Sequence, residues 1–155
     1  MKKQGLIAGL ALAAAMALSP LPRMAFADTY MPPVGGFATD GSLFAGVEPV
    51  TQIAVYTTSD DAPGLLTWDD GKKYCSALHD AGHKDWRLPD HDELLLLYQH
   101  RKIGALNGTF NKTGGPAGWY WSSSESGSQA WSKRFSNGDE NYDYEDDKSS
   151  VRCVR

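Results

Sequence analysis

Basic residues are not in excess in this sequence, and cysteines are few. Lysine and arginine number 15 against 19 aspartates and glutamates, and the two cysteines are Cys75 and Cys153. Nucleic acids and anionic membrane surfaces are bound through clustered lysines and arginines, so the acidic balance argues against both as the main partner. Beyond the first 27 residues the sequence has no long apolar run, so membrane insertion of that part is not expected. Cationic or neutral partners fit this composition better.

The N-terminal residues have the pattern of a secretory signal peptide. Lys2 and Lys3 give a basic start, residues 5–18 are apolar, and Ala25 and Ala27 are small residues two positions apart. A membrane anchor would need about 20 apolar residues, so export with cleavage after Ala27 is predicted, to the periplasm or out of the cell. Cleavage would remove three basic residues and no acid, which changes the formal charge from −4 to −7, and would leave one domain of 128 residues (155 − 27).

Export favours a disulfide. Exported proteins meet an oxidising environment, and two cysteines allow a single intramolecular bond, here between Cys75 and Cys153. Two buried free thiols, or a catalytic thiol, are the competing interpretations. A bond between residues 78 positions apart (153 − 75) would stabilise the fold by about 4 to 5 kcal/mol in the chain-entropy model.

The first half of the chain predicts a strand and a helix. Residues 28–52 are rich in glycine and proline and are expected to form a leader or an ordered loop over the domain. A short β-type run at 53–56 predicts the first strand. Thr67 then stands where a helix cap is expected, and the apolar spacing continues to a stop at Gly82, with Cys75 on the inner face.

A second helix is predicted at residues 90–103. Asp90 as its cap, with Glu93 three residues later, forms a capping box after the extended run Trp86-Arg87-Leu88-Pro89. We expect Arg87 to pair with Glu93 or an aspartate, because a guanidinium between apolar neighbours is costly without a partner. The N-terminal segment or a partner is expected to cover Leu95 or Leu96. The expected buried stripe is Leu94, Leu97, Tyr98 and Ile103.

The second half of the chain predicts a long loop followed by a meander. Residues 104–118 read as an irregular loop, of a length usual for functional or mobile loops. Apolar and polar residues then alternate as in strands, Asn137-Gly138 is a hairpin signal, and a last strand is expected at 150–154. Strand, two helices, loop and antiparallel meander together define the α+β class. Buried aromatic residues are expected at Trp68, Trp86, Trp121, Trp131 and Phe135.

Candidate contact residues lie near the end of the predicted loop. Trp119 is the best candidate for an exposed aromatic platform that stacks on a sugar or a peptide side chain, with core packing as the alternative. Tyr120, Asn111 and Glu125 are the other ligand-binding candidates. The serines at 122–124 lack the Gly-x-Ser-x-Gly context of a nucleophile and are expected to form a turn.

Metal binding has weak support in the sequence. Asp139, Asp143 and Glu145 belong to an acidic run and would share one side of an extended strand, and calcium prefers such oxygen ligands. A solvated acidic hairpin that prevents edge pairing is the favoured interpretation. His79 and His83 could share a metal only if the first helix continued past Gly82, which is not expected. No cofactor is therefore predicted, with calcium as the weak candidate.

Five segments of the chain carry a resemblance to a known family. They are LTWDDGKKYC, GHKDWRLPDHDEL, YWSSSE, AWSKRFSNG and VRCVR, and in this order they resemble the Lcl C-terminal domain family, named for a bacterial collagen-like adhesin. The resemblance covers roughly residues 56–155. The DWRLP-x-x-x-EL and VR-x-VR pieces also resemble the formylglycine-generating enzymes, and both families are similar to C-type lectin-like domains. The resemblance implies that fold, in which a cysteine of the first helix pairs with one of the last strand, here Cys75 with Cys153.

Two departures limit what the resemblance implies about chemistry. The formylglycine-generating enzymes use a redox-active cysteine pair and copper, whereas both cysteines here are assigned to the structural bond, so that catalysis is not expected. Calcium-dependent lectins carry Glu-Pro-Asn or Gln-Pro-Asp and Trp-Asn-Asp triplets, which this sequence does not contain. Sugar capture through calcium therefore has no motif to support it.

Two classes of function remain. The first is a non-catalytic recognition module for a glycan or protein ligand, resembling an adhesin, with residues 104–118, Trp119, Tyr120 and the acidic hairpin as its contact surface. The second is an enzyme of unrecognised type that uses Glu125, Asp85 or a histidine. An enzyme would need a deep pocket in which titratable groups with perturbed pKa values converge. The recognition module is the predicted function.

Overall fold

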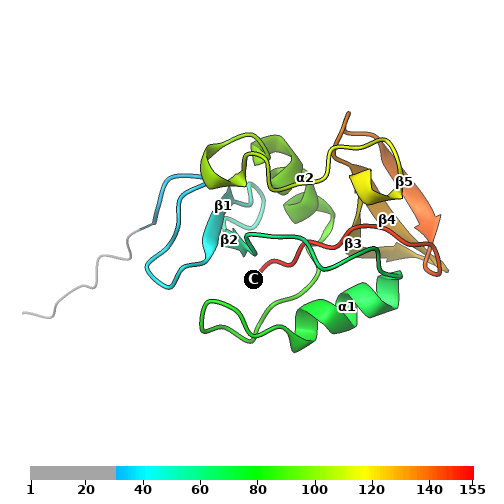
Figure 1. Cartoon of the computed structure of the whole chain (residues 1–155), viewed down its shortest axis with the longest axis horizontal. Coiled ribbons are helices and arrows are strands. Elements are labelled where there is room, and N and C mark those ends of the chain that lie inside the picture. Colours follow the sequence, from blue (N-terminus) through cyan, green and yellow to red (C-terminus); the bar gives the residue numbers. More distant parts are fainter. Residues whose placement is uncertain (1–30) are drawn as a thin grey trace, which may run out of the picture.

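A computed structural model describes residues 31–155, so the predicted signal peptide at residues 1–27 lies outside the described residues. Two helices and two antiparallel sheets make up this part of the chain, which confirms the α+β class (Figure 1). The elements are β1 (Leu43–Val47), β2 (Ala54–Thr57), α1 (Trp68–Ala77), α2 (His91–His100), the 3-10 turns η1 (Gly104–Leu106) and η2 (Pro116–Gly118), β3 (Trp119–Ser126), β4 (Gln129–Arg134) and β5 (Glu140–Tyr144). In these described residues, no helix has both the length and the apolar character needed to cross a membrane.

The N-terminal hairpin β1–β2 corrects the prediction of a loop across residues 28–52. Leu43, Phe44 and Ala45 are buried, and Leu43 and Phe44 pair with the predicted first strand, which the structure places at β2. The register shifts between Phe44 and Gly46, and Gly46 has a φ of +137°. The sequence does not predict β1, because this strand is short, contains a bulge and is surrounded by glycine and proline.

Helix α1 begins where its cap predicts and ends earlier than expected. The Thr67 hydroxyl accepts a hydrogen bond from the Asp70 amide at 3.3 Å. The helix ends at Ala77 rather than near Gly82, because Leu78 is already extended. Cys75 is fully buried and bonded to Cys153, with 5.5 Å between their Cα atoms, so the predicted disulfide is confirmed.

Helix α2 carries the predicted capping box. The Asp90 side chain accepts a hydrogen bond from the Glu93 backbone amide, and the Glu93 side chain accepts one from the Asp90 backbone amide. Arg87 donates two further hydrogen bonds to the Glu93 carboxylate, at 2.5 and 2.7 Å. The helix ends at His100, which leaves Ile103 exposed instead of in the buried stripe. Leu96 is 3% exposed and contacts the hairpin beside Gly46, which confirms the prediction that the N-terminal segment covers one of these leucines.

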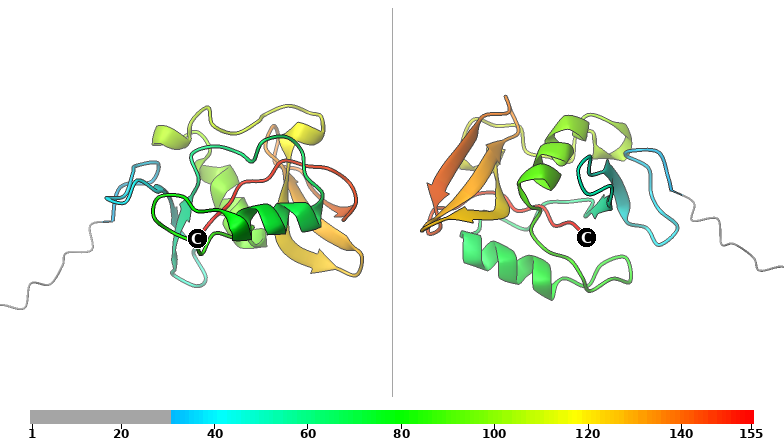
Figure 2. Two further views of the ribbon diagram at one scale, coloured as in Figure 1. Left: turned by 60° about the horizontal axis from the view of Figure 1, so that its bottom comes forward. Right: turned by 180° about the vertical axis from the view of Figure 1, so that it is seen from behind.

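The second sheet has the order β3-β4-β5 and lies at one end of the molecule (Figures 1 and 2). The predicted turn at Asn137-Gly138 separates β4 from β5. Two clusters of buried side chains form the core: one joins α2, the first hairpin and the sheet, and the other surrounds the disulfide. All five predicted aromatic anchors are buried in them: Trp131 and Phe135 in the first cluster, and Trp68, Trp86 and Trp121 in the second.

The C-terminal segment is extended but forms no continuous strand, so the strand predicted at 150–154 is wrong. The segment crosses the molecule between the two sheets, as Figure 1 shows in red. Val154 bridges to Thr57 and to Arg87, Ser149 to Leu66 and Ser150 to Tyr120. Because each short pairing has a different partner, no ladder propagates. The segment instead ties together both sheets and the start of α1.

Candidate functional site

A solvent-open cleft of about 450 Å³ lies on the second sheet, and we call it the Trp119 cleft. Its sides come from four separate segments: the end of the long loop with the first residue of β3, the edge strand β5, the chain that follows β5, and the chain just before α1. The lining residues are Leu65, Gly114, Gly115, Pro116, Trp119, Asn141, Asp143, Asp147, Lys148 and Ser149. The cleft therefore brings together the loop, Trp119 and the acidic hairpin of the predicted contact surface.

The strand register puts the cleft side chains on one face of the sheet. Trp119 pairs with Arg134 of β4, and Asn141 and Asp143 pair with Ser132 and Ala130 of the same strand. Directly paired residues, and residues two apart along a strand, project to the same face. Asp143 is held in place there, since its carboxylate accepts hydrogen bonds from the Ser132 hydroxyl at 2.5 Å and from the side-chain amide of Asn141 at 2.6 Å.

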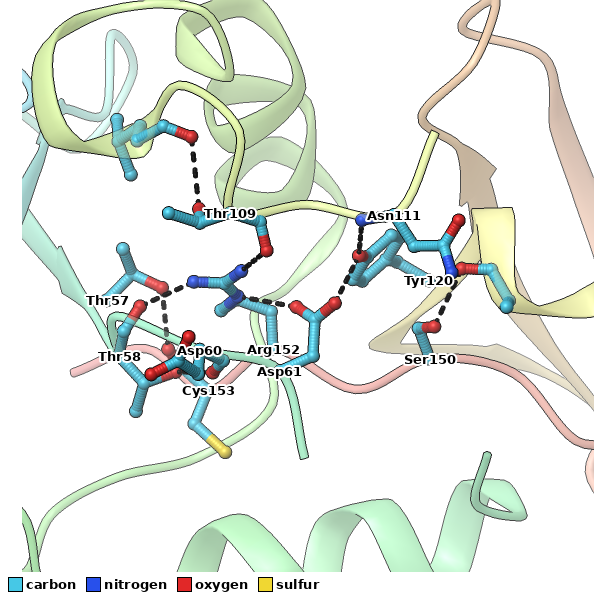
Figure 3. Close-up of polar contacts among 12 residues, drawn as sticks. Thr57, Thr58, Asp60, Asp61, Thr109, Asn111, Tyr120, Ser150, Arg152 and Cys153 are labelled. Atoms are coloured by element: carbon cyan, nitrogen blue, oxygen red, sulfur yellow. Dashed lines mark hydrogen bonds and ion pairs between the residues drawn. The ribbon is translucent and has the colours of Figure 1, made fainter. Parts of the chain in front are cut away.

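A buried arginine fastens the start of the long loop to the core (Figure 3). The side chain of Arg152 is 0% exposed. Its guanidinium donates to the Asp61 carboxylate at 2.8 Å and to the carbonyl oxygens of Thr58 and Thr109, each at 2.6 Å. The ring of Phe110 lies 4.1 Å from the guanidinium carbon. We call this arrangement the Arg152 site; it is a charge-assisted network in which each guanidinium nitrogen has an acceptor.

Tyr120 extends the same network to the next part of the loop (Figure 3). Its hydroxyl donates to Asp61 at 2.6 Å and accepts a hydrogen bond from the Asn111 amide at 2.7 Å. Burial raises the pKa of Tyr120 well above its usual range, and the negative charge of Asp61 adds to this effect. The phenol is therefore neutral and able to donate at any physiological pH.

The far end of the loop is fixed by a second set of contacts. Arg134 donates to the Gly114 carbonyl at 2.6 Å, and the Ser150 hydroxyl donates to the Ala117 carbonyl at 2.8 Å. At Gly118 there is no room for a side chain, because a Cβ atom would lie 1.8 Å from the Thr113 carbonyl oxygen. The loop is thus held at both ends, and the cleft side at Gly114 to Pro116 is preformed.

The structure separates the four candidate ligand-binding residues. Trp119 is half-buried and lines the cleft, with the guanidinium carbon of Arg134 5.6 Å from its ring. Tyr120 is 0% exposed, so burial removes its side chain from the contact surface. Asn111 is half-buried and contributes its backbone amide to the network, and its side chain accepts from the Thr113 amide. Glu125 is exposed near the other end of β3 and does not line the cleft.

The metal candidates do not converge. Asp139 accepts hydrogen bonds from Asn137 and Arg134, Asp143 lines the cleft, and Glu145 lies just after β5. Across residues 31–155 no group of three or more histidine, cysteine or acidic side chains is placed to hold a metal ion. His79 lies beyond the end of α1, and His83 pairs instead with Asp40, at 2.8 Å.

Several residues of the site were missed at the level of sequence. Lys148 and Ser149 line the cleft although they belong to no helix or strand, whereas Asp147, which also lines it, is the last residue of the acidic run predicted as part of the contact surface. In the sequence, Arg152 stands out only as part of the VRCVR segment. Its neighbours Val151 and Cys153 pack in the cluster around the disulfide. In an extended chain the residue between them projects to the opposite side, so the alternation could have indicated that Arg152 lies in a different environment.

The geometry defines a class of protein: a small α+β domain, closed by one disulfide, with a preformed surface cleft. The family model of the Lcl C-terminal domain matches residues 49–155, and the chain belongs to this family. The matched region begins after β1 and includes the cleft, the Arg152 site and both cysteines. The comparison with curated proteins found no match.

Proposed function

We propose that this chain is an exported, non-catalytic recognition module that binds a glycan or protein ligand at the Trp119 cleft, as an adhesin domain does. The observation that carries the proposal is the cleft itself, where a half-buried tryptophan, a preformed loop and hydrogen-bonding side chains of β5 meet. Aromatic surface beside fixed polar groups is the usual composition of a binding site. The lining holds two acids, Asp143 and Asp147, and one base, Lys148, and this negative balance favours neutral or cationic ligands.

The arrangement of titratable groups supports binding over catalysis. In the described residues, the groups whose pKa is shifted are Asp40, Glu48, Asp69, Arg87 and Tyr120, and none of them lines the cleft. A nucleophile within reach of a base is the signature of covalent catalysis. The Ser132 hydroxyl lies 2.5 Å from the Asp143 carboxylate, but Ser132 is 0% exposed, so its hydroxyl is not accessible to a substrate. The proposal includes no cofactor.

We extend the proposal to a C-type lectin-like fold. Its support is the bond from α1 to the C-terminal segment, together with two helices packed against antiparallel sheets. In such a fold the irregular loops form the contact surface, and here residues 104–118 take that position beside β5. The proposed export of the protein rests on the signal-peptide pattern of residues 1–27 and is consistent with the disulfide.

Arrays of glycans and peptides, each probed with and without calcium, test the function. We expect the mature domain to bind a restricted set of ligands, and Trp119→Ala to lose that binding. Phe37→Ala removes an aromatic side chain that is 53% exposed and lies outside the cleft, so it is the matched control and is expected to bind normally. Equal binding by the wild type and Trp119→Ala would exclude the cleft as the site, and turnover of a bound ligand would support the enzyme alternative.

A further inference from the structure

We infer that the ligand of the Trp119 cleft is an extended basic peptide segment, which pairs with the free edge of β5 and places a lysine or arginine side chain in the cleft. This inference rests on the proposed function and specifies its ligand. It combines three independent features of the described residues: the charges around the cleft, the chemistry of its aromatic side, and the edge strand next to it.

The charges around the cleft are only partly compensated within the chain. Lys133 pairs with Glu140 at 2.6 Å, and Arg134 pairs with Asp139 at 3.5 Å. The remaining acids of this hairpin are Asp143, Glu145, Asp146 and Asp147, and within residues 31–155 none of them has a lysine or arginine at ion-pair distance. Lys148 also lines the cleft, but within the described residues it forms no ion pair with these acids, so a cationic ligand side chain would meet carboxylates that are not already paired with a cation.

The cleft has the same chemistry as the cation site that the protein builds in its own interior. Arg152 lies between the carboxylate of Asp61 and the ring of Phe110. In the cleft, the ring of Trp119 and the carboxylate of Asp143 likewise line one surface, and the guanidinium carbon of Arg134, 5.6 Å from the ring, shows that this ring already faces one cation. Aromatic rings attract cations at their faces, and carboxylates bind ammonium and guanidinium groups through charge-assisted hydrogen bonds. A neutral sugar would use the ring but not the charges.

The free edge of β5 explains why the ligand is an extended peptide. In the described part of the chain β5 pairs with β4 alone, and Figures 1 and 2 show it at the outer edge of its sheet. An unpaired edge presents backbone N–H and C=O groups to which another strand can bond. Side chains of an added strand would alternate between the two faces of the sheet.

Both faces of β5 offer contacts to such a strand. On the cleft face, alternate ligand side chains would lie beside Asn141 and Asp143. On the other face they would lie beside Tyr142 and Tyr144, which are 48% and 61% exposed, and beside a second cavity of about 490 Å³ to which Trp131 contributes. An exposed tyrosine pair on an edge strand supplies apolar area for the side chains that do not enter the cleft.

The acids on and next to β5 determine which strand it accepts. Charged edge strands discourage pairing with a second copy of the same chain, because like charges would face each other. The same charges favour a strand that carries lysine or arginine. The acids can therefore prevent pairing with a second copy of the chain and also select a basic strand, and both roles exclude an acidic partner.

The test uses synthetic peptides and calorimetry on the mature domain at low salt. The first peptide alternates lysine with threonine, the second replaces lysine by glutamate, and the third keeps lysine but is N-methylated at alternate backbone amides, which blocks strand pairing without changing charge. We expect the first peptide to bind, and the other two to bind at least about tenfold more weakly. Binding of the first peptide should also weaken as salt rises.

Two domain variants locate the binding. Asp147→Asn removes one charge from the cleft and is expected to weaken binding of the lysine peptide by about threefold to tenfold. Asp60→Asn removes an exposed charge outside the cleft and is expected to leave the affinity for this peptide unchanged. Equal binding of the N-methylated and unmodified peptides would overturn strand pairing. Failure of the lysine peptide, alongside array ligands that need Trp119, would overturn the inference and leave the proposed function standing. If neither the lysine peptide nor any array ligand bound to the domain, both the inference and the proposed function would be overturned.

Discussion

The Arg152 site and the Trp119 cleft use the same kinds of group in opposite ways. In the Arg152 site a carboxylate, backbone carbonyls and an aromatic ring surround an arginine of the chain itself, and every guanidinium nitrogen has an acceptor. In the cleft, Trp119 and Asp143 present similar groups to solvent. A closed polar network stabilises the fold, and an open one is available to a ligand. Changes in the first region should lower stability, and changes in the second should alter binding.

The largest effect is expected from the disulfide, the covalent part of the closed region. Replacing Cys75 and Cys153 together by serine should lower the free energy of unfolding by about 4 to 5 kcal/mol, because the unfolded chain gains the freedom of a long loop. Urea unfolding of the oxidised wild type, the reduced wild type and the double variant measures this. If the reduced and oxidised proteins unfolded at the same urea concentration, the bond would not stabilise the fold as described.

Arg152→Met should be the next most damaging change. The variant leaves the half-buried Asp61 without its cation and leaves the Thr58 and Thr109 carbonyls without a donor, at a cost of about 3 to 5 kcal/mol. The matched change Arg134→Met removes a partly exposed pair next to the cleft and should cost about 1 kcal/mol. Similar losses in the two variants, measured by thermal unfolding, would remove the distinction between the two regions.

Gly118→Ala tests whether the loop positions the cleft. An added Cβ atom would lie 1.8 Å from the Thr113 carbonyl oxygen, so the loop must shift, and we expect a loss of about 2 kcal/mol together with weaker ligand binding. Gly115→Ala is the control for stability in the same loop, since no atom beyond its chain neighbours lies within 4 Å of its Cβ position. Gly115 itself lines the cleft, so array binding is measured for Gly118→Ala against the wild type, and unfolding is measured for both variants. Normal binding by Gly118→Ala would contradict a preformed cleft.

The smallest stability effect concerns pH and Asp40, which joins the N-terminal segment to His83 and Arg155. Partial burial raises the pKa of Asp40, but hydrogen bonds from Ser42 and His83 and the charge of Arg155 outweigh this and hold it well below its usual range. A lowered folded-state pKa contributes stability above the unfolded value of about 3.9 and loses it as pH falls further.

The wild type should therefore exceed Asp40→Asn by about 1 kcal/mol near pH 7, after allowance for solvent screening, and this difference should shrink below about pH 4. Urea unfolding across this pH range measures the difference. A constant difference down to pH 2 would show that the carboxylate charge of Asp40 is not the source.

Local signals explain what the sequence could predict. The capping pairs at Thr67 and at Asp90 with Glu93 mark helix starts through bonds between near neighbours, and both are present. The aromatic anchors could be predicted from their size, and the disulfide from the number of cysteines. A cover over Leu95 or Leu96 was expected because a helix with four consecutive leucines leaves too much apolar surface on one side, and Leu96 is the one that the hairpin covers.

Distant contacts explain what the sequence could not predict. β1 was missed because its pairing with β2 overrides a composition rich in glycine. The C-terminal segment has the alternation of a strand, but its neighbours change at almost every residue. Ser149 enters the cleft only because the chain after β5 turns back toward Leu66, and no local pattern encodes that approach.

The most direct test of the recognition surface is a nuclear magnetic resonance titration of the mature domain with a ligand recovered from the arrays. We expect the backbone amide shifts of residues 114–119 and 141–149 to change most, because these segments contribute nearly all of the cleft lining. The amides around Arg152 should change little, since that site is closed. Shift changes concentrated on the β1–β2 hairpin or on α1, with the cleft residues unchanged, would contradict the account.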